Sequence, residues 1–490
     1  MPAPTASLSS ARSLPWAVLT LLFLISLPAV TTRLYASDEI EYFAYLRSLY
    51  FDRDLSFDNE YRYFYDHGIA QGGQMRSDGT GRRGDLFHRT FLENTTATGL
   101  RTNFAPIGSA LLWAPFYVMT DVGVRIARGL GSEVAADGFS HPYISSITYG
   151  SAVYGFLALV LSAIAARRIV GVTPGIVAAV CFGTPLVFYM YVAPGFSHAN
   201  SAFAVAAFVV TWLHVRRDWS AGGAAALGAL AALMGMVREQ DLFIAIGPAV
   251  DFGRTLLSPR RHSVRGMLVA GVAGALAFAV CYVPQAVSYL VLFGHLGPDP
   301  IVAGKMTWTS PNAGRVLLSP DNGWLFWTPL ALPALIGLVA LASGYGRGAA
   351  GRGTVDDTER RWIGGLCLAM LATQIYVSGS LSTWAGAGSF GQRRLVGLSI
   401  FLVIGLATLL QMMRAGWSRF VVNAIIVLSV WWNLGLIAQF ATGLMNRARV
   451  EPSRNAYNNF VTIPLQSPRL AYRYVFDRQS FYQSRTQPLH

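Results

Sequence analysis

The sequence predicts an all-α polytopic membrane protein with about eleven transmembrane helices. Of its 490 residues, 53% are hydrophobic and only 13% are charged, which is about half the charged share of a soluble protein. Apolar segments close to the roughly 20 residues of a membrane-spanning helix recur along the whole chain. The net charge of +13 is distributed between these segments, so it indicates membrane orientation and argues against nucleic acid as a partner.

The basic residues between the apolar segments give the orientation. Positive residues favour the cytoplasmic side, and arginine pairs such as Arg167–Arg168 and Arg260–Arg261 fall there when the N-terminus lies inside. The first segment is interpreted as a retained span, because no small-residue cleavage site follows it closely. The expected spans are 14–32, 143–166, 172–191, 199–214, 221–237, 240–253, 266–292, 324–343, 362–378, 395–413 and 420–441.

The segment 102–123 is also apolar enough to cross the membrane, but it is expected to lie flat at the outer interface. If it crossed, every later arginine pair would change sides and the charge bias would invert. Pro106, Trp113 and Pro115 are typical of an amphipathic or half-inserted interfacial helix.

These positions divide the chain into modules. Residues 1–343 form a front transmembrane module, which contains a large first extracytoplasmic loop at 33–142. The Gly- and Arg-rich segment 344–361 predicts a cytoplasmic linker, and 362–441 form a back transmembrane module. The C-terminal tail, 442–490, is expected on the extracytoplasmic side.

The acidic sequence YASDEIEY lies directly behind the first span. Asp38, Glu39 and Glu41 stand at the mouth of the membrane, where ionised groups are costly and usually functional. The spacing of the apolar residues after Asp38 predicts a short surface helix, with Asp38 as N-cap and both glutamates in the first turn. A purely structural, capping role for Asp38 remains an alternative.

Other polar residues are expected on the same outer face. Arg393 and Arg394 follow a glycine-rich run, and paired guanidinium groups at headgroup level can bind a phosphate bidentately, although interfacial snorkelling is the alternative. The loop 293–323 contributes Lys305. Arg238, beside Glu239 and Asp241, is interpreted mainly as part of an ion pair. The expected substrate-pocket residues are Glu41, Tyr42, His198, Arg238 and Trp308.

No cofactor is expected from the sequence. Cys181, Cys281 and Cys367 are scattered in apolar runs, which gives neither a disulfide framework nor metal-ligand spacing. A glycine-rich nucleotide-binding loop is absent, and nothing indicates a divalent metal.

Four short stretches together resemble a known group of enzymes. YASDEIEYFAYLRSL resembles the acidic motif of the GT-C superfamily of glycosyltransferases, which includes protein O-mannosyltransferases and the aminoarabinose transferase of lipid A modification. PIGSALLWAPF, GWLFWTPL and WAGAGSFGQRR are similar to segments of bacterial membrane proteins in that group. The resemblance implies a GT-C-like helical bundle in a bacterial inner membrane, with its active site on the extracytoplasmic face.

The resemblance also implies a reaction. Such enzymes take a sugar from a polyprenyl-phosphate donor, and a carboxylate in the first outer loop activates the acceptor with inversion at the anomeric carbon. Asp38 matches that position, and Glu39 adjoins it where some relatives place a second acid. Arg393, Arg394 and Lys305 are then expected to bind the donor phosphate in the membrane lipid. The acceptor, whether glycan, lipid or protein, is left open.

Two other classes of function fit a multi-span chain. A transporter or flippase of a lipid-linked saccharide would carry charges within its spans and broken helices at the midplane. A polysaccharide ligase or polymerase would also present arginines on the outer face. The acidic motif in the first outer loop favours the transferase over both.

Overall fold

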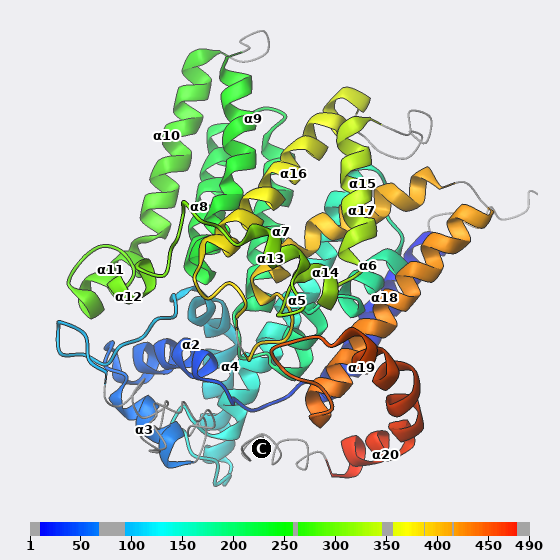
Figure 1. Ribbon diagram of the computed structural model, residues 1–490. Helices are drawn as coiled ribbons and strands as arrows, with labels where there is room; N and C mark the ends of the chain where they lie inside the picture. Colours follow the sequence, from blue (N-terminus) through cyan, green and yellow to red (C-terminus); the bar gives the residue numbers. More distant parts are fainter. Residues whose placement is uncertain are drawn as a thin grey trace, which may run out of the picture.

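The protein is helical throughout the part that the computed structural model describes, namely residues 10–67, 94–257, 263–344, 356–386, 388–413 and 416–477 (Figure 1). Within these ranges there are twenty α-helices and no strands, which confirms the all-α prediction. Seven apolar segments are long enough to cross a membrane, so this is a multi-pass membrane protein. They are α4 (Gly108–Gly129), α5 (His141–Ile169), α7 (His198–Val215), α10 (Val264–Cys281), α16 (Asp357–Ser380), η6 with α17 (Arg393–Met412) and α18 (Trp417–Thr442).

Several expected spans are interrupted or short. The expected span 266–292 divides into α10 and α11 (Val283–Phe293), because Pro284 cannot continue the hydrogen-bond ladder of α10. The span 324–343 divides in the same way at Pro329. The shorter or interrupted apolar elements are α1 (Ser10–Ser26), α6 (Pro174–Phe182), η4 (Phe188–Val192), α8 (Ala221–Val237), η5 (Glu239–Ala245), α9 (Ile246–Leu256), α14 (Trp324–Trp327) and α15 (Ala331–Ser343).

Small residues allow the central helices to approach closely. A Cβ atom on Gly337 of α15 would stand 1.9 Å from the carbonyl oxygen of Gly405 in α17, and one on Gly228 of α8 would stand 2.0 Å from that of Gly274 in α10. Such contacts are typical of helix pairs in membranes, where packing replaces the hydrophobic driving force. α17 is buried from Ser399 to Leu409 and forms the centre of the bundle.

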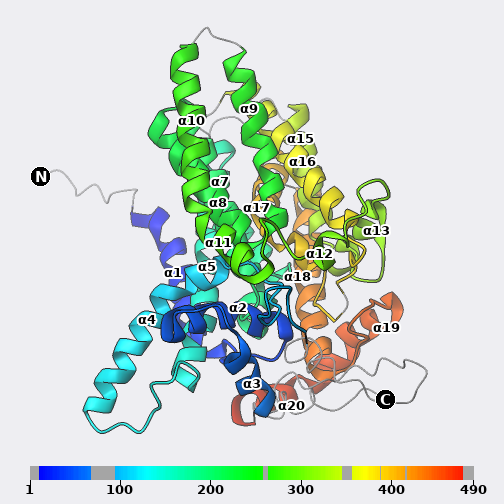
Figure 2. The same ribbon diagram turned by 90° about the vertical axis from the view of Figure 1, so that its left-hand side faces the viewer.

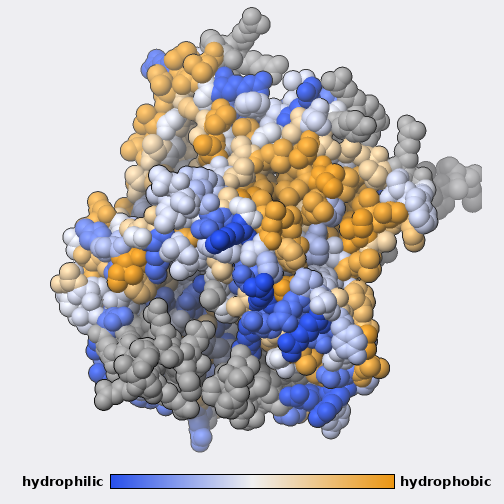
Figure 3. All heavy atoms as spheres, viewed as in Figure 1, coloured by the Kyte–Doolittle hydropathy of each residue, from blue (hydrophilic) through white to orange (hydrophobic). Residues whose placement is uncertain are grey.

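The outward faces of the peripheral helices are apolar. Val272, Leu276 and Val280 of α10 and Val427 and Leu428 of α18 are all more than half exposed. Figure 3 shows hydrophobic surface over the upper right of the molecule and mostly hydrophilic surface below it. Large exposed aliphatic areas of this kind suit contact with lipid.

The first loop forms helices at the end of the molecule opposite the α9–α10 turn, as Figures 1 and 2 both show. They are α2 (Ser37–Arg47), a π-helical turn (Ser48–Asp52), α3 (Asp58–Asp66) and α4. Aromatic rings hold them together: Phe43 of α2 makes edge contacts with Phe64 of α3 and Tyr117 of α4. The described part of the loop therefore packs as one aromatic cluster beside the bundle.

α4 includes most of the segment 102–123, which was expected to lie flat at the outer interface, and it packs lengthwise against α5. Its first residue, Gly108, lies against the backbone of Met236 at the end of α8. From there α4 follows the first half of α5, since Trp113 donates a hydrogen bond to Ser151. It runs along α5 and not across it.

The C-terminal segment packs at the same end of the molecule as α2 and α3. It comprises α19 (Pro452–Tyr457), a π-helical turn (Asn458–Thr462) and α20 (Ile463–Phe476). The Tyr474 hydroxyl donates to the Ala29 carbonyl at 3.0 Å, which ties α20 to the end of the first span. α16 begins at Asp357, before the expected end of the linker, because the Asp356 side chain accepts from the backbone N–H of Glu359.

Candidate functional site

A cavity of about 680 Å³ lies where α2, η5, α12 (Pro300–Ala303), the end of α16 and η6 meet. Seven of the ten residues expected at the site line it. These are Asp38, Tyr42, Arg238, Lys305, Trp308, Arg393 and Arg394. Positions more than 350 residues apart in sequence therefore meet in one pocket, as the sequence predicted. Its volume is that of a small-molecule site.

Asp38 forms an ion pair with Arg393 inside this cavity. The Nη1 atom of Arg393 donates to Oδ2 of Asp38 at 2.7 Å. Asp38 lies deep in the protein, yet 40% of its side-chain surface is exposed to the cavity. Burial alone would raise the pKa of this carboxyl, but Arg393, with smaller contributions from Arg238 and Arg394, outweighs burial and holds the pKa below its usual range. Asp38 is therefore ionised and open to a ligand.

Glu39, the second expected catalytic acid, serves the helix terminus. Ala36 is the N-cap of α2, so the expectation that Asp38 caps this helix is wrong. The Oε2 atom of Glu39 accepts from the backbone N–H groups of Tyr35 and Ala36, at 2.7 and 3.0 Å. This side chain is buried and does not line the cavity. The capping role belongs to Glu39, which leaves Asp38 free for another one.

Glu41 is buried behind Asp38 and does not line the cavity either. Burial raises the pKa of Glu41 well above its ordinary value, and the negative charge of Asp38 raises it further. The backbone N–H of Phe104 donates to Glu41 without reversing this effect. Two carboxyls one helical turn apart thus have pKa values displaced in opposite directions, and of these two only Asp38 lines the cavity.

Arg238 supports the wall of the cavity through a hydrogen-bonded chain. Its Nη1 atom donates to Nδ1 of His198 at 2.9 Å and to Ser197 at 3.4 Å. The Ser197 hydroxyl in turn donates to the Tyr42 hydroxyl at 2.9 Å. His198 is 1% exposed and lies behind the lining, so its effect on a ligand would pass through Arg238. Since an arginine can only donate, Nδ1 of His198 is the acceptor.

The expected ion pair of Arg238 with Glu239 or Asp241 is absent from the described residues. Glu239 accepts from the Tyr289 hydroxyl, and Asp241 accepts from the Ser201 hydroxyl at 2.5 Å. The 3₁₀ conformation of η5 directs these neighbouring side chains to different helices. Within the described residues Arg238 therefore makes no close ion pair, although its charge contributes to the lowered pKa of Asp38 and partly offsets the effect of burial on the pKa of Asp241.

Arg394 is held by the turn that follows α16. It donates to the carbonyl and hydroxyl oxygens of Thr383, at 2.6 and 3.1 Å. Gly386 of this turn has φ +56°, and a Cβ atom there would lie 3.7 Å from Arg393 and 3.9 Å from Arg394. The left-handed backbone of this turn favours glycine, while a Cβ atom would make only ordinary contacts with the two guanidinium groups.

Lys305 and Trp308 close the opposite wall. The Lys305 carbonyl accepts from the backbone N–H of Ser382 at 2.8 Å, which fixes the loop 293–323 against the turn after α16. The Lys305 ammonium lies 5.8 Å from the ring centre of Phe104. The half-exposed indole of Trp308 lies between the rings of Phe243 and Tyr376.

The lining carries more positive than negative charge. Four cationic side chains face the cavity, and only Asp38 and Glu239 oppose them, which leaves an excess of two positive charges. Part of the rim is apolar, including Phe243, Val302 and Trp308. A cavity of this kind suits an anionic group attached to an apolar body.

Some lining residues were not expected from the sequence. Gln240 donates to the Arg394 carbonyl at 2.8 Å, and its own carbonyl accepts from Gln374 at 2.6 Å. In the sequence, only the position of Gln240 at the start of an apolar segment could have indicated that it lines the site. No cluster of three metal-binding side chains occurs within the described ranges.

Comparison with known proteins adds no family to this geometry. No protein-family model matches the sequence, and no curated protein matches it. The cavity itself is therefore the basis for any statement about function.

Proposed function

We propose that this protein is an integral membrane glycosyltransferase. It would move a sugar from a polyprenyl-phosphate donor to an acceptor at the extracytoplasmic face, as the GT-C resemblance implies. The observation that carries the proposal is an ionised Asp38 in the same cavity as four cationic side chains. The proposed transfer needs a general base, for which Asp38 is the candidate, and a site for the donor phosphate, for which the cationic side chains are the candidates.

In the proposed reaction Asp38 is the general base. The acceptor oxygen attacks the anomeric carbon as its proton passes to the Asp38 carboxylate. The bond between that carbon and the phosphate oxygen breaks, and its electron pair leaves with the lipid phosphate. Attack opposite to the leaving group inverts the configuration. Proton removal by a placed base typically contributes 10²–10⁴-fold in rate.

Arg393 couples donor binding to the strength of this base. In the free cavity it pairs with Asp38 and keeps the carboxyl pKa low. A bound phosphate would share the Arg393 N–H groups and add negative charge beside Asp38. Both changes raise the pKa of Asp38, so the carboxylate becomes a better proton acceptor when the donor is present.

Arg394, Lys305 and Arg238 would hold the donor phosphate and stabilise the charge that grows on it. The lipid chain would leave across the apolar rim at Phe243, which is 44% exposed. Ile246 and Val250 continue this exposed apolar face along α9. A route sideways into the membrane suits a lipid donor better than a free nucleotide sugar.

The placement of the charges supports an enzyme over a transporter. Arg238, Lys305 and Arg393 lie at helix ends or in loops on one side of the bundle. Transporters instead place their binding site near the midplane between broken helices. A polysaccharide ligase or polymerase would use the same phosphate site with a glycan acceptor, and the choice of acceptor separates it from the proposed function.

The direct experiment incubates the purified protein with a panel of polyprenyl-phosphate sugars and measures donor consumption. We expect one donor to be consumed by the wild type and by Asp66→Asn, which removes an exposed carboxylate elsewhere in the first loop. Asp38→Asn should consume it at least about 10²-fold more slowly. Transmembrane movement of an intact donor, without consumption, would instead identify a flippase.

A further inference from the structure

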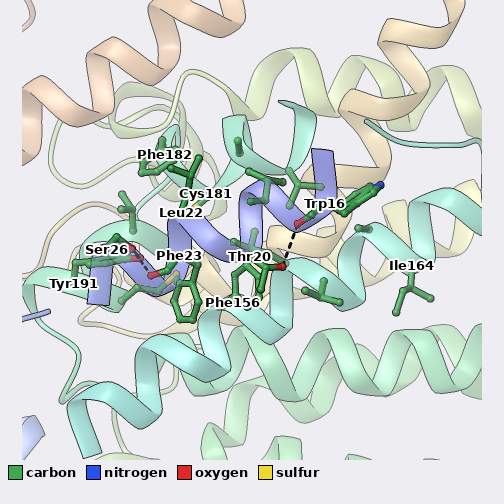
Figure 4. Close-up of a pocket in the computed structure, with 18 of the residues that line it drawn as sticks. Trp16, Thr20, Leu22, Phe23, Ser26, Phe156, Ile164, Cys181, Phe182 and Tyr191 are labelled. Atoms are coloured by element: carbon green, nitrogen blue, oxygen red, sulfur yellow. Dashed lines mark hydrogen bonds between the residues drawn. The ribbon is translucent and has the colours of Figure 1, made fainter. Parts of the chain in front are cut away.

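A second cavity, of about 580 Å³, lies between α1 and the bundle (Figure 4). It shares no lining residue with the cavity at Asp38. Aliphatic and aromatic side chains of α1, α5 and α6 supply most of its wall, including Leu22, Phe23, Phe156 and Phe182. An open, mostly apolar cavity of this size in a membrane protein can hold a hydrocarbon chain.

The two ends of this cavity differ chemically. At one end lie Trp16 and Arg167, and at the other the Ser26 and Tyr191 hydroxyl groups join in a hydrogen bond of 2.6 Å. Figure 4 shows Trp16 and Ile164 at one side of the cavity and the Ser26–Tyr191 pair at the opposite side. Because the two hydroxyl groups are hydrogen-bonded to each other, a ligand needs no polar group at that end of the cavity.

Among the described residues that line this cavity, Arg167 is the one cation. It stands in the last turn of α5, is exposed, and makes no ion pair or side-chain hydrogen bond with any residue in the described part of the chain. On the topology set by the arginine bias, this end faces the cytoplasm. An indole and a guanidinium together at the mouth of an apolar cavity match the headgroup level of a bilayer.

The length of the cavity corresponds to one leaflet. From Trp16 to Ser26 the lining follows ten residues of helix, roughly 15 Å at 1.5 Å per residue. Half of a hydrocarbon core of about 30 Å is the same length. A chain that enters beside Arg167 would therefore lie along α1 as far as Ser26.

We propose that this cavity binds an acyl chain of an anionic phospholipid from the cytoplasmic leaflet, with the lipid phosphate on Arg167. The site is separate from the donor cavity, and its occupation does not depend on the proposed transferase activity. The lipid would fill the space between α1 and α5–α6 and hold the first span against the bundle.

The headgroup part is tested on the full-length protein in mild detergent, without any glycosyl donor. The melting temperature is followed while phosphatidylglycerol or phosphatidylcholine is added. We expect phosphatidylglycerol to stabilise the wild type at lower concentration, and Arg167→Gln to need roughly tenfold more of it, as for loss of a hydrogen bond to a charged group. Arg217→Gln, an exposed arginine on the same predicted side and outside the cavity, should behave as the wild type. An identical response of Arg167→Gln and the wild type would overturn the proposal.

The acyl part is tested with a phosphatidylglycerol that carries a photoreactive diazirine in its chain. We expect it to label peptides of α1 and α6 in the wild type and in Leu21→Phe, which adds a ring on the exposed face of α1. Ala178→Phe fills the cavity and should abolish this labelling. Undiminished labelling of α1 and α6 in Ala178→Phe would show that the chain lies elsewhere. Because Arg167 is exposed, the Arg167→Gln comparison remains decisive even if Ala178→Phe fails to fold.

Discussion

The Asp38–Arg393 ion pair should couple these two residues in stability. Three variants define the coupling: Asp38→Asn, Arg393→Gln and the double substitution. Exposed pairs contribute up to about 1 kcal/mol, whereas breaking a fully buried pair costs about 3–5 kcal/mol. Asp38 and Arg393 keep 40% and 22% of their side-chain surfaces exposed, so screening reduces the buried figure. We expect a coupling of roughly 1–2 kcal/mol.

The assay follows unfolding of the purified protein by tryptophan fluorescence at neutral and acidic pH. The double variant should be no less stable than the more damaging single variant, because the remaining partner is then no longer an unpaired charge. The lowered pKa of Asp38 stabilises the fold above the unfolded-state pKa of about 3.9, and this stabilisation is lost as pH falls through the lower folded-state pKa. Asp38→Asn should lack this component. Additive losses in the double variant, with the same acid dependence in wild type and Asp38→Asn, would refute the pairing.

Three further results are expected. Arg394→Ala should weaken donor binding roughly tenfold, and Arg394→Lys should restore it only in part, because lysine lacks the planar guanidinium group. Arg315→Gln, on the same predicted face, is the control, and equal donor affinities in all variants would favour interfacial snorkelling of Arg394. Glu39→Gln should lower the free energy of unfolding by about 1 kcal/mol and leave transfer within a few fold, whereas a loss as large as that of Asp38→Asn would make Glu39 the base. Reporter fusions within 344–361 and within 60–95 should fall on opposite sides of the membrane, and a shared side would overturn the topology.

The sequence predicted the meeting of the polar residues better than their individual roles. The topology derived from the arginine bias placed Asp38, Arg238 and Arg393 on the extracytoplasmic face. The paired arginines at the start of a span indicated an anionic ligand. The sequence did not distinguish Asp38 from Glu39 as the base, because the two carboxylates are adjacent in the acidic motif. That choice depends on backbone geometry: Glu39 at the third helical position reaches back to the Ala36 N–H, and Asp38 faces the cavity.

The remaining differences have local causes. Arg238, Glu239 and Asp241 are adjacent in sequence, which suggests an ion pair, but the 3₁₀ turn directs them to different partners. The apolar segment around α4 is long enough to span, so hydropathy alone could not set its orientation. That orientation follows from its contacts with α5, beginning at Trp113.

The most direct measurement compares single-turnover sugar transfer by the wild type, Asp38→Asn and Glu39→Gln at saturating donor. Donor affinity is measured in parallel, so that a chemical defect is distinguished from a binding defect. We expect Asp38→Asn to bind the donor and to transfer at least about 10²-fold more slowly, with Glu39→Gln near the wild-type rate. Transfer by Asp38→Asn at the wild-type rate would contradict the assignment of Asp38 as the base.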